Sequence, residues 1–91
     1  GAPGMCKQIS DGELGFTKVE NNSSGVVNLK PGDIVCFNWG HVGIVYEVVK
    51  EGSDYDGIFT IESNSGQIRS WYSWDGSGFE TDRIKFFGGI R

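Results

Sequence analysis

Residues 31–45, which read PGDIVCFNWGHVGIV, constrain the fold of this chain more than any other segment. A Pro-Gly-Asp turn opens the segment, and β-branched and aromatic residues follow on both sides of Trp39 and Gly40. This pattern predicts two antiparallel strands joined by a sharp corner. His41, the one histidine of the chain, stands at the start of the second strand.

The remainder of the chain after residue 32 also favours strands. Runs of β-branched and aromatic residues predict five of them, at residues 33–38, 41–49, 57–62, 67–73 and 83–87. Short connections between successive strands predict an antiparallel meander that curls into a half-barrel. Residues 5–14 could form a short helix that stops at Gly15, but their apolar face is weak, so we expect a peripheral turn there. The predicted class is α+β, a curled antiparallel sheet of about five strands with little helix.

Length and charge limit the organisation further. Ninety-one residues allow one small domain, which we divide into an irregular leader, residues 1–28, and a sheet region, residues 29–91. The net charge of −4 argues against nucleic acid as a partner. No apolar run approaches the roughly 20 residues that span a bilayer, so no membrane partner is expected. The N-terminus shows no signal-peptide pattern.

Metal binding is not expected from this composition. The chain has a single histidine, two cysteines and no CxxC pair, so a zinc site would need scattered carboxylates. Residues 53–57 resemble part of a calcium loop, but the alignment places its first and last ligand positions at Gly52 and Ser63. That breaks the calcium pattern, and we interpret the segment as a polar turn.

The candidate catalytic residues are His41, Glu62 and Asn64. Residues 59–66 read FTIESNSG, so Glu62 and Asn64 end a predicted strand and share a face if the strand continues. A histidine with a carboxylate or amide on a neighbouring strand forms two parts of a nucleophile–base–orienter site. The alternative is a structural histidine, a hairpin turn at residues 64–66 and a solvated glutamate.

Neither cysteine has the surroundings of a nucleophile. Cys36 lies in mid-strand, where a cysteine is usually a small buried hydrophobe and lacks the helix N-terminus that lowers a thiol pKa. Cys6 lies in MCKQISDGE, which has too few apolar residues for a helix packed on a sheet.

The segments LKPGDIVCFNWGHVGIVYEV and IFTIESNSG closely resemble the CHAP domain (cysteine, histidine-dependent amidohydrolase/peptidase). This is a papain-like fold of peptidoglycan hydrolases from bacteria and their phages, and the resemblance covers residues 29–91. It implies that His41 is the catalytic histidine and that the orienting residue is Glu62 or Asn64. It also implies a cysteine peptidase or N-acetylmuramoyl-L-alanine amidase that is secreted or acts on the cell wall, with peptidoglycan as its partner and no cofactor.

One departure from the family concerns the nucleophile, which in CHAP domains opens an apolar helix well upstream of the Pro-Gly-Asp turn. Residues 1–4 resemble the segment just after that helix. We therefore expect the chain to be the C-terminal portion of such a domain, with an upstream cysteine preferred over Cys6 and with no activity alone. An uncovered sheet face would then favour self-association. The alternative is a non-catalytic β-module that binds cell-wall peptide or glycan through its tryptophans.

Overall fold

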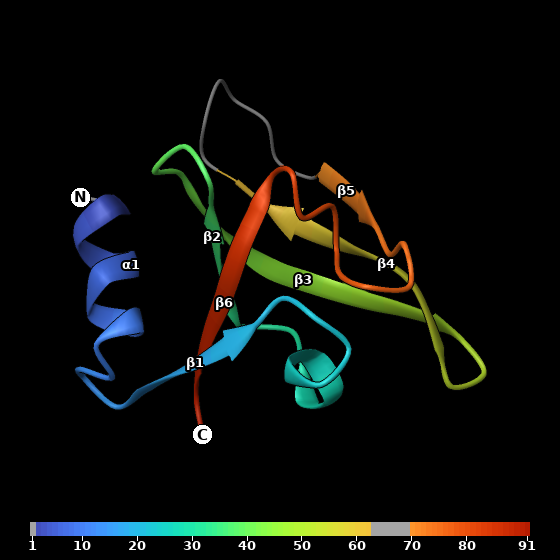
Figure 1. Cartoon of the computed structure of the whole chain (residues 1–91), viewed down its shortest axis with the longest axis horizontal. Helices are drawn as coiled ribbons and strands as arrows, with labels where there is room; N and C mark the ends of the chain where they lie inside the picture. Colours follow the sequence, from blue (N-terminus) through green and yellow to red (C-terminus); the bar gives the residue numbers. More distant parts are fainter. Residues whose placement is uncertain (1, 63–69) are drawn as a thin grey trace.

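The computed structural model describes residues 2–62 and 70–91, which form one antiparallel sheet with one short α-helix (Figure 1). This confirms the α+β class with little helix. The elements, in chain order, are α1 (Ala2–Ser10), β1 (Phe16–Glu20), the 3₁₀ helix η1 (Gly25–Asn28), β2 (Ile34–Phe37), β3 (Val42–Glu51), β4 (Asp54–Ile61), β5 (Ser70–Ser73) and β6 (Ile84–Ile90).

The strand order of the sheet is β1-β6-β2-β3-β4-β5, and every neighbouring pair is antiparallel. Strands β2 to β5 follow one another as the predicted meander. The last strand, β6, instead crosses back and lies between β1 and β2 (Figure 1). The described sheet therefore has six strands rather than about five, and it is not a simple meander. The extra strand is β1, which lies in the region predicted to be an irregular leader.

The leader proves to be largely regular, which corrects the expectation for residues 1–28. Helix α1 packs against β1 and β6 rather than forming a peripheral turn. Its Ile9 is fully buried, and it fits because Gly88 has no side chain: a Cβ there would lie 2.4 Å from Ile9. A disulfide between Cys6 and Cys36 also joins α1 to β2. Helix α1 is thus held on the sheet by Ile9 and the disulfide, without the broad apolar face that a packed helix usually has.

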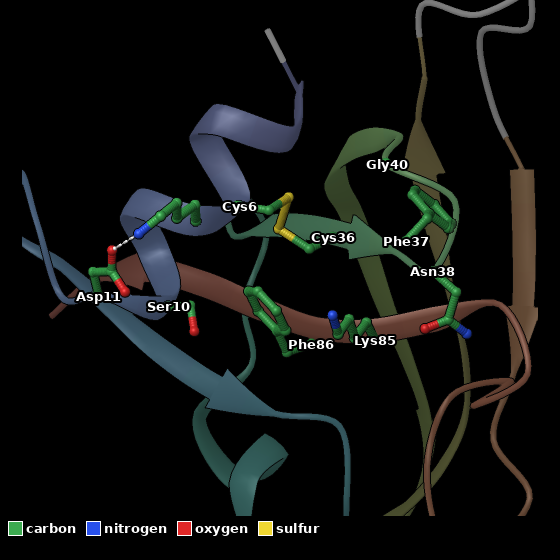
Figure 2. Close-up of a pocket in the computed structure, with 10 residues that line it drawn as sticks. Cys6, Ser10, Asp11, Cys36, Phe37, Asn38, Gly40, Lys85 and Phe86 are labelled. Carbon is green, nitrogen blue, oxygen red and sulfur yellow. Dashed lines mark hydrogen bonds and ion pairs between the residues drawn. A yellow bond between two sulfur atoms is a disulfide. The ribbon is translucent and has the colours of Figure 1, made fainter.

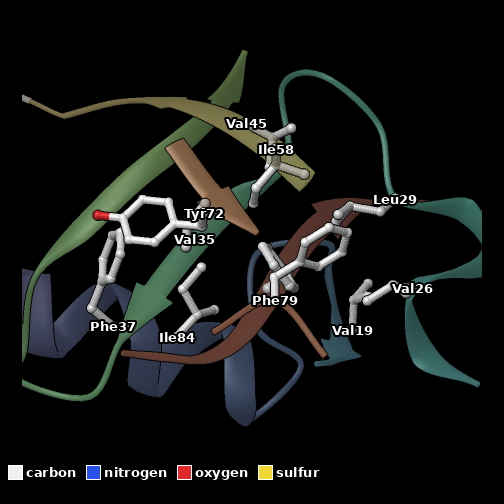
Figure 3. Close-up of a cluster of buried hydrophobic side chains, with 11 residues drawn as sticks. Val19, Val26, Leu29, Val35, Phe37, Val45, Ile58, Tyr72, Phe79 and Ile84 are labelled. Atoms are coloured by element: carbon white, nitrogen blue, oxygen red, sulfur yellow. The ribbon is translucent and has the colours of Figure 1, made fainter. Parts of the chain in front are cut away.

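The two faces of the sheet carry separate hydrophobic clusters, because successive side chains of a strand point to opposite sides. On β2, Val35 and Phe37 enter the larger cluster and Cys36 enters the smaller one beneath α1. In the larger cluster, Phe37 and Tyr72 lie side by side at one end (Figure 3), with ring centroids 5.4 Å apart. The buried members of the larger cluster are Val19, Val26, Leu29, Val35, Phe37, Val45, Ile58, Tyr72, Phe79, Ile84 and Phe87.

Candidate functional site

His41 lies at the end of the tight connection between β2 and β3. The N–H of Phe37 donates to the carbonyl oxygen of His41 over 3.0 Å and closes this connection. Gly40 has a φ of 77°, a left-handed conformation that suits glycine and places the imidazole directly after the corner. The side chain of His41 is 15% exposed, so the ring is shielded but reachable from solvent.

Glu62 directly follows β4, the strand that pairs with β3. In this pairing Ile44 stands opposite Ile61, which brings the end of β4 to the start of β3. The Nε2 atom of His41 and the Oε1 atom of Glu62 are 2.8 Å apart. The predicted proximity of His41 and Glu62 is thus confirmed. Asn64 lies outside the described residues.

Gly43 leaves the space that Glu62 occupies. It lies two residues after His41, on the same face of β3, and it is buried. A Cβ at this position would be 3.0 Å from Cγ of Glu62 and 3.1 Å from the carbonyl oxygen of Ile61. Gly43, the second glycine of the GHVG sequence, therefore lets the side chain of Glu62 lie across β3 toward the imidazole.

Two hydroxyl groups hold the other oxygen of Glu62. The hydroxyl of Thr60 donates to Oε2 over 2.7 Å, and the hydroxyl of Tyr72 donates to the same oxygen over 2.8 Å. Thr60 is fully buried and Tyr72 is nearly so. The carboxylate is therefore bonded on both oxygens, with His41 on one and two neutral donors on the other.

The hydrogen bonds favour an ionised Glu62. Burial opposes ionisation, but the hydrogen bonds from Thr60, Tyr72 and His41 outweigh it and hold the pKa of Glu62 below its usual value of 4.5. Burial, followed by the hydrogen bond to Glu62, raises the pKa of Tyr72 well above its usual value, so its hydroxyl keeps its proton. The site thus combines a carboxylate acceptor with fixed hydroxyl donors.

Aromatic rings surround the imidazole. The ring of Phe37 lies 5.1 Å from that of His41, measured between centroids, and forms part of the buried cluster. The indole of Trp39 stacks nearly parallel to the imidazole at 5.9 Å, and Trp39 is 56% exposed. One aromatic side chain therefore supports the imidazole from the core, and another shields it at the surface.

Both cysteines are bonded to each other, which leaves the chain without a free thiol. The disulfide bridges α1 and β2 and lines a hollow of about 350 Å³ (Figure 2). Cys36 stands opposite Val42 in the β2–β3 pairing, so its side chain leaves the sheet on the face away from His41. Cys36 is not a nucleophile in this state, as expected from the sequence, and Cys6 is equally unavailable.

The arrangement orients the imidazole of His41 and favours one of its tautomers. An ionised carboxylate can only accept hydrogen bonds, so Nε2 of His41 donates, and in the neutral form of the imidazole the lone pair then lies on Nδ1. Sequence reasoning missed Thr60 and Tyr72 as partners of Glu62. Thr60 left a signal, because a residue two positions before Glu62 on a strand shares its face. Tyr72 left none, since its place depends on the register between β4 and β5.

Among the described residues, no group of three or more His, Cys, Asp or Glu side chains could hold a metal ion. Within the same part of the chain, no helix is long and apolar enough to cross a membrane. No family model, curated protein or solved structure matches the chain.

Proposed function

We propose that this chain belongs to a peptidoglycan hydrolase of the CHAP type, in which His41 is the general base and Glu62 its orienting residue. The carrying observation is the 2.8 Å contact between Nε2 of His41 and Oε1 of Glu62, formed by residues of the GHVGIV and TIES segments. The histidine and the carboxylate on neighbouring strands support this assignment of the site, whereas the sheet itself, six antiparallel strands in an open order, supports no more than the α+β class. The papain-like assignment is part of the same proposal.

In the proposed reaction, a thiolate attacks the carbonyl carbon of a peptide bond or of an N-acetylmuramoyl–L-alanine amide. His41 takes the thiol proton and later gives it to the leaving amine, and Glu62 stabilises the imidazolium between these steps. Because Cys6 and Cys36 form a disulfide, neither offers a thiolate in this state, and we propose that the nucleophile is a cysteine outside these 91 residues. The chain then supplies the base and the orienting residue of a composite site.

A lysis assay on purified cell walls tests this proposal. The 91-residue chain should cause no loss of turbidity, with or without a reducing agent. An extended protein, in which a segment that carries the proposed nucleophilic cysteine precedes Gly1, should lyse the walls. His41→Ala in the extended protein should then reduce the rate at least about 100-fold, the usual contribution of a general base. Glu62→Ala should have a smaller effect in the same direction.

Three results would contradict parts of the proposal. Lysis by the extended protein that survives His41→Ala would remove His41 from the mechanism. Lysis by the reduced 91-residue chain that disappears in Cys6→Ala would identify Cys6 as the nucleophile. An extended protein that is folded but inert on walls of every type assayed would contradict the hydrolase assignment.

A non-catalytic β-module is the second candidate, because the chain has no free thiol and exposes two of its tryptophans. Trp39 and Trp71 are 56% and 42% exposed. Exposed indole rings can stack on sugars or on peptide side chains. Cosedimentation with insoluble peptidoglycan separates the candidates: binding that is lost in Trp71→Ala but unchanged in His41→Ala would favour the β-module.

A further inference from the structure

The two carboxylate oxygens of Glu62 have different hydrogen-bond partners. Oε1 faces His41, whereas Oε2 accepts from both Thr60 and Tyr72. The carboxylate of a glutamate is joined to Cα through three rotatable bonds, so it can reorient unless other groups fix it. Here the two hydroxyl groups fix one oxygen and thereby aim the other at Nε2.

The surrounding side chains and backbone also pack tightly around the side chain of Glu62. Gly43 lies so close to Glu62 that a Cβ would be 3.0 Å from its Cγ, and Tyr72 packs against Phe37 in the core. Thr60, Tyr72 and Glu62 are exposed by 0%, 5% and 8%. Water therefore has little access with which to replace either hydroxyl, and a lost hydroxyl leaves a buried carboxylate oxygen short of a donor.

We propose that Thr60 and Tyr72 are positioning residues, which hold Glu62 so that His41 keeps its proton on Nε2 and presents the lone pair of Nδ1 to the reacting groups. This inference rests on the proposed function, because it assigns a role within the same site. Both hydroxyl groups donate to Glu62, and both residues are buried. Their effect passes through Glu62 to the tautomer of His41, a property distinct from the stability of the fold.

The single histidine makes this proposal directly measurable. Long-range ¹H–¹⁵N correlation spectra report which ring nitrogen of a neutral imidazole carries the proton, and here one imidazole gives the whole signal. The 91-residue chain should show predominantly the Nε2–H form. In the Thr60→Val/Tyr72→Phe double variant, the ratio of the Nε2–H to the Nδ1–H form should fall about fivefold or more, since two hydrogen bonds to a charged group are lost.

Matched controls separate positioning from folding. Tyr55→Phe removes another tyrosine hydroxyl, which donates to the carbonyl oxygen of Val26, and should leave the tautomer ratio unchanged. Thr60→Ser keeps a hydroxyl and should preserve the parent ratio. If the double variant fails to unfold cooperatively, the single variant Tyr72→Phe gives the same readout, with a smaller fall expected.

An unchanged ratio in a cooperatively folded double variant, or an equal fall in Tyr55→Phe, would overturn the positioning role. The spectra do not require hydrolysis. A fall in the ratio combined with no lysis by the extended protein would therefore retain the positioning role and contradict only the hydrolase assignment.

Discussion

The guanidinium of Arg91 donates to both carboxylate oxygens of Asp33 over 2.9 Å each, and it ties the last residue of the chain to the turn before β2. The side chain of Asp33 is 1% exposed and also accepts from the backbone N–H and Nζ of Lys30. A carboxylate this buried requires its partners, because an unpaired charge in the interior is costly. The Pro-Gly-Asp turn that precedes the site is therefore held by the side chain of Arg91.

Replacing Arg91 should destabilise the fold. Arg91→Ala leaves Asp33 with Lys30 alone, and we expect the free energy of unfolding to fall by about 2 kcal/mol. Urea denaturation measures this change. Arg83→Ala is the matched control, because Arg83 pairs with Glu80 at 3.7 Å and its side chain is 59% exposed, so a loss of no more than about 0.5 kcal/mol is expected. Equal losses in the two variants would contradict the role given to the Arg91–Asp33 pair.

Acid should destabilise the protein through Asp33 and Glu62. For Asp33 the effect of burial is outweighed by hydrogen bonds from Arg91 and Lys30, so the pKa lies below its usual value of 3.8, and the pKa of Glu62 lies below 4.5. Between the folded and unfolded pKa values the unfolded chain binds more protons, so stability rises with pH there. Both contributions are complete above about pH 4.5 and are lost as the pH falls through the folded pKa values.

Denaturation at a series of pH values from about 6 to 3 checks this expectation. Glu62→Gln removes the contribution of Glu62, so the stability of this variant should fall less steeply over the same pH range than that of the parent chain. A parallel pair of curves would show that Glu62 ionises alike in the folded and unfolded chains.

The pairing of His41 with Glu62 could be predicted from sequence because it depends on short-range features. The corner at Gly40 and the run from Phe59 to Glu62 define two strand ends, and consecutive strands joined by a short loop pair in antiparallel fashion. The meander from β2 to β5 follows from the same rule. Of the two hydroxyl donors to Glu62, only Thr60 could be predicted, because it lies two residues before Glu62 in the same segment. Tyr72 could not, because it reaches Glu62 through the pairing of β4 with β5.

The N-terminal part could not be predicted in the same way, because contacts distant in sequence hold it. Helix α1 depends on Ile9 fitting over Gly88 and on the Cys6–Cys36 disulfide, neither of which produces a periodic pattern. Strand β1 is short, and its burial is irregular. Asn21, in the polar run ENNSSG of the predicted leader, is buried and bonds to the backbone of Phe79.

Opening the Cys6–Cys36 disulfide should lower stability substantially. The two residues are 30 positions apart, and a loop of that length corresponds to about 3.5 kcal/mol in the chain-entropy description. The parent chain should therefore unfold at a lower urea concentration when a reducing agent is present. The Cys6→Ala/Cys36→Ala variant should match the reduced parent and should not respond to the reducing agent. A parent chain that is indifferent to reduction would contradict this expectation.

The outer face of strands β3 to β5 should promote self-association. Ile44 stands opposite Ile61, and Phe59 stands opposite Trp71, so the four side chains share the face away from the larger cluster. Ile44, Ile61 and Trp71 are 46%, 40% and 42% exposed. Burial of apolar surface contributes about 25 cal/mol per Å², which makes a contiguous apolar face a favourable contact between two copies. We expect sedimentation velocity to show a monomer at low concentration and a dimer or larger species at high concentration.

Charge placed on this face should shift that equilibrium. Ile44→Lys/Ile61→Lys puts two cations side by side on neighbouring strands and should weaken dimerisation at least about tenfold, since two buried lysines would repel and lose hydration. Val27→Lys is the control, because Val27 is 64% exposed on η1, outside this face, and its replacement should leave the equilibrium unchanged. A parent chain that sediments as a monomer at every concentration would show that the exposed face does not drive association. Dimerisation weakened equally by Val27→Lys would place the contact elsewhere on the surface.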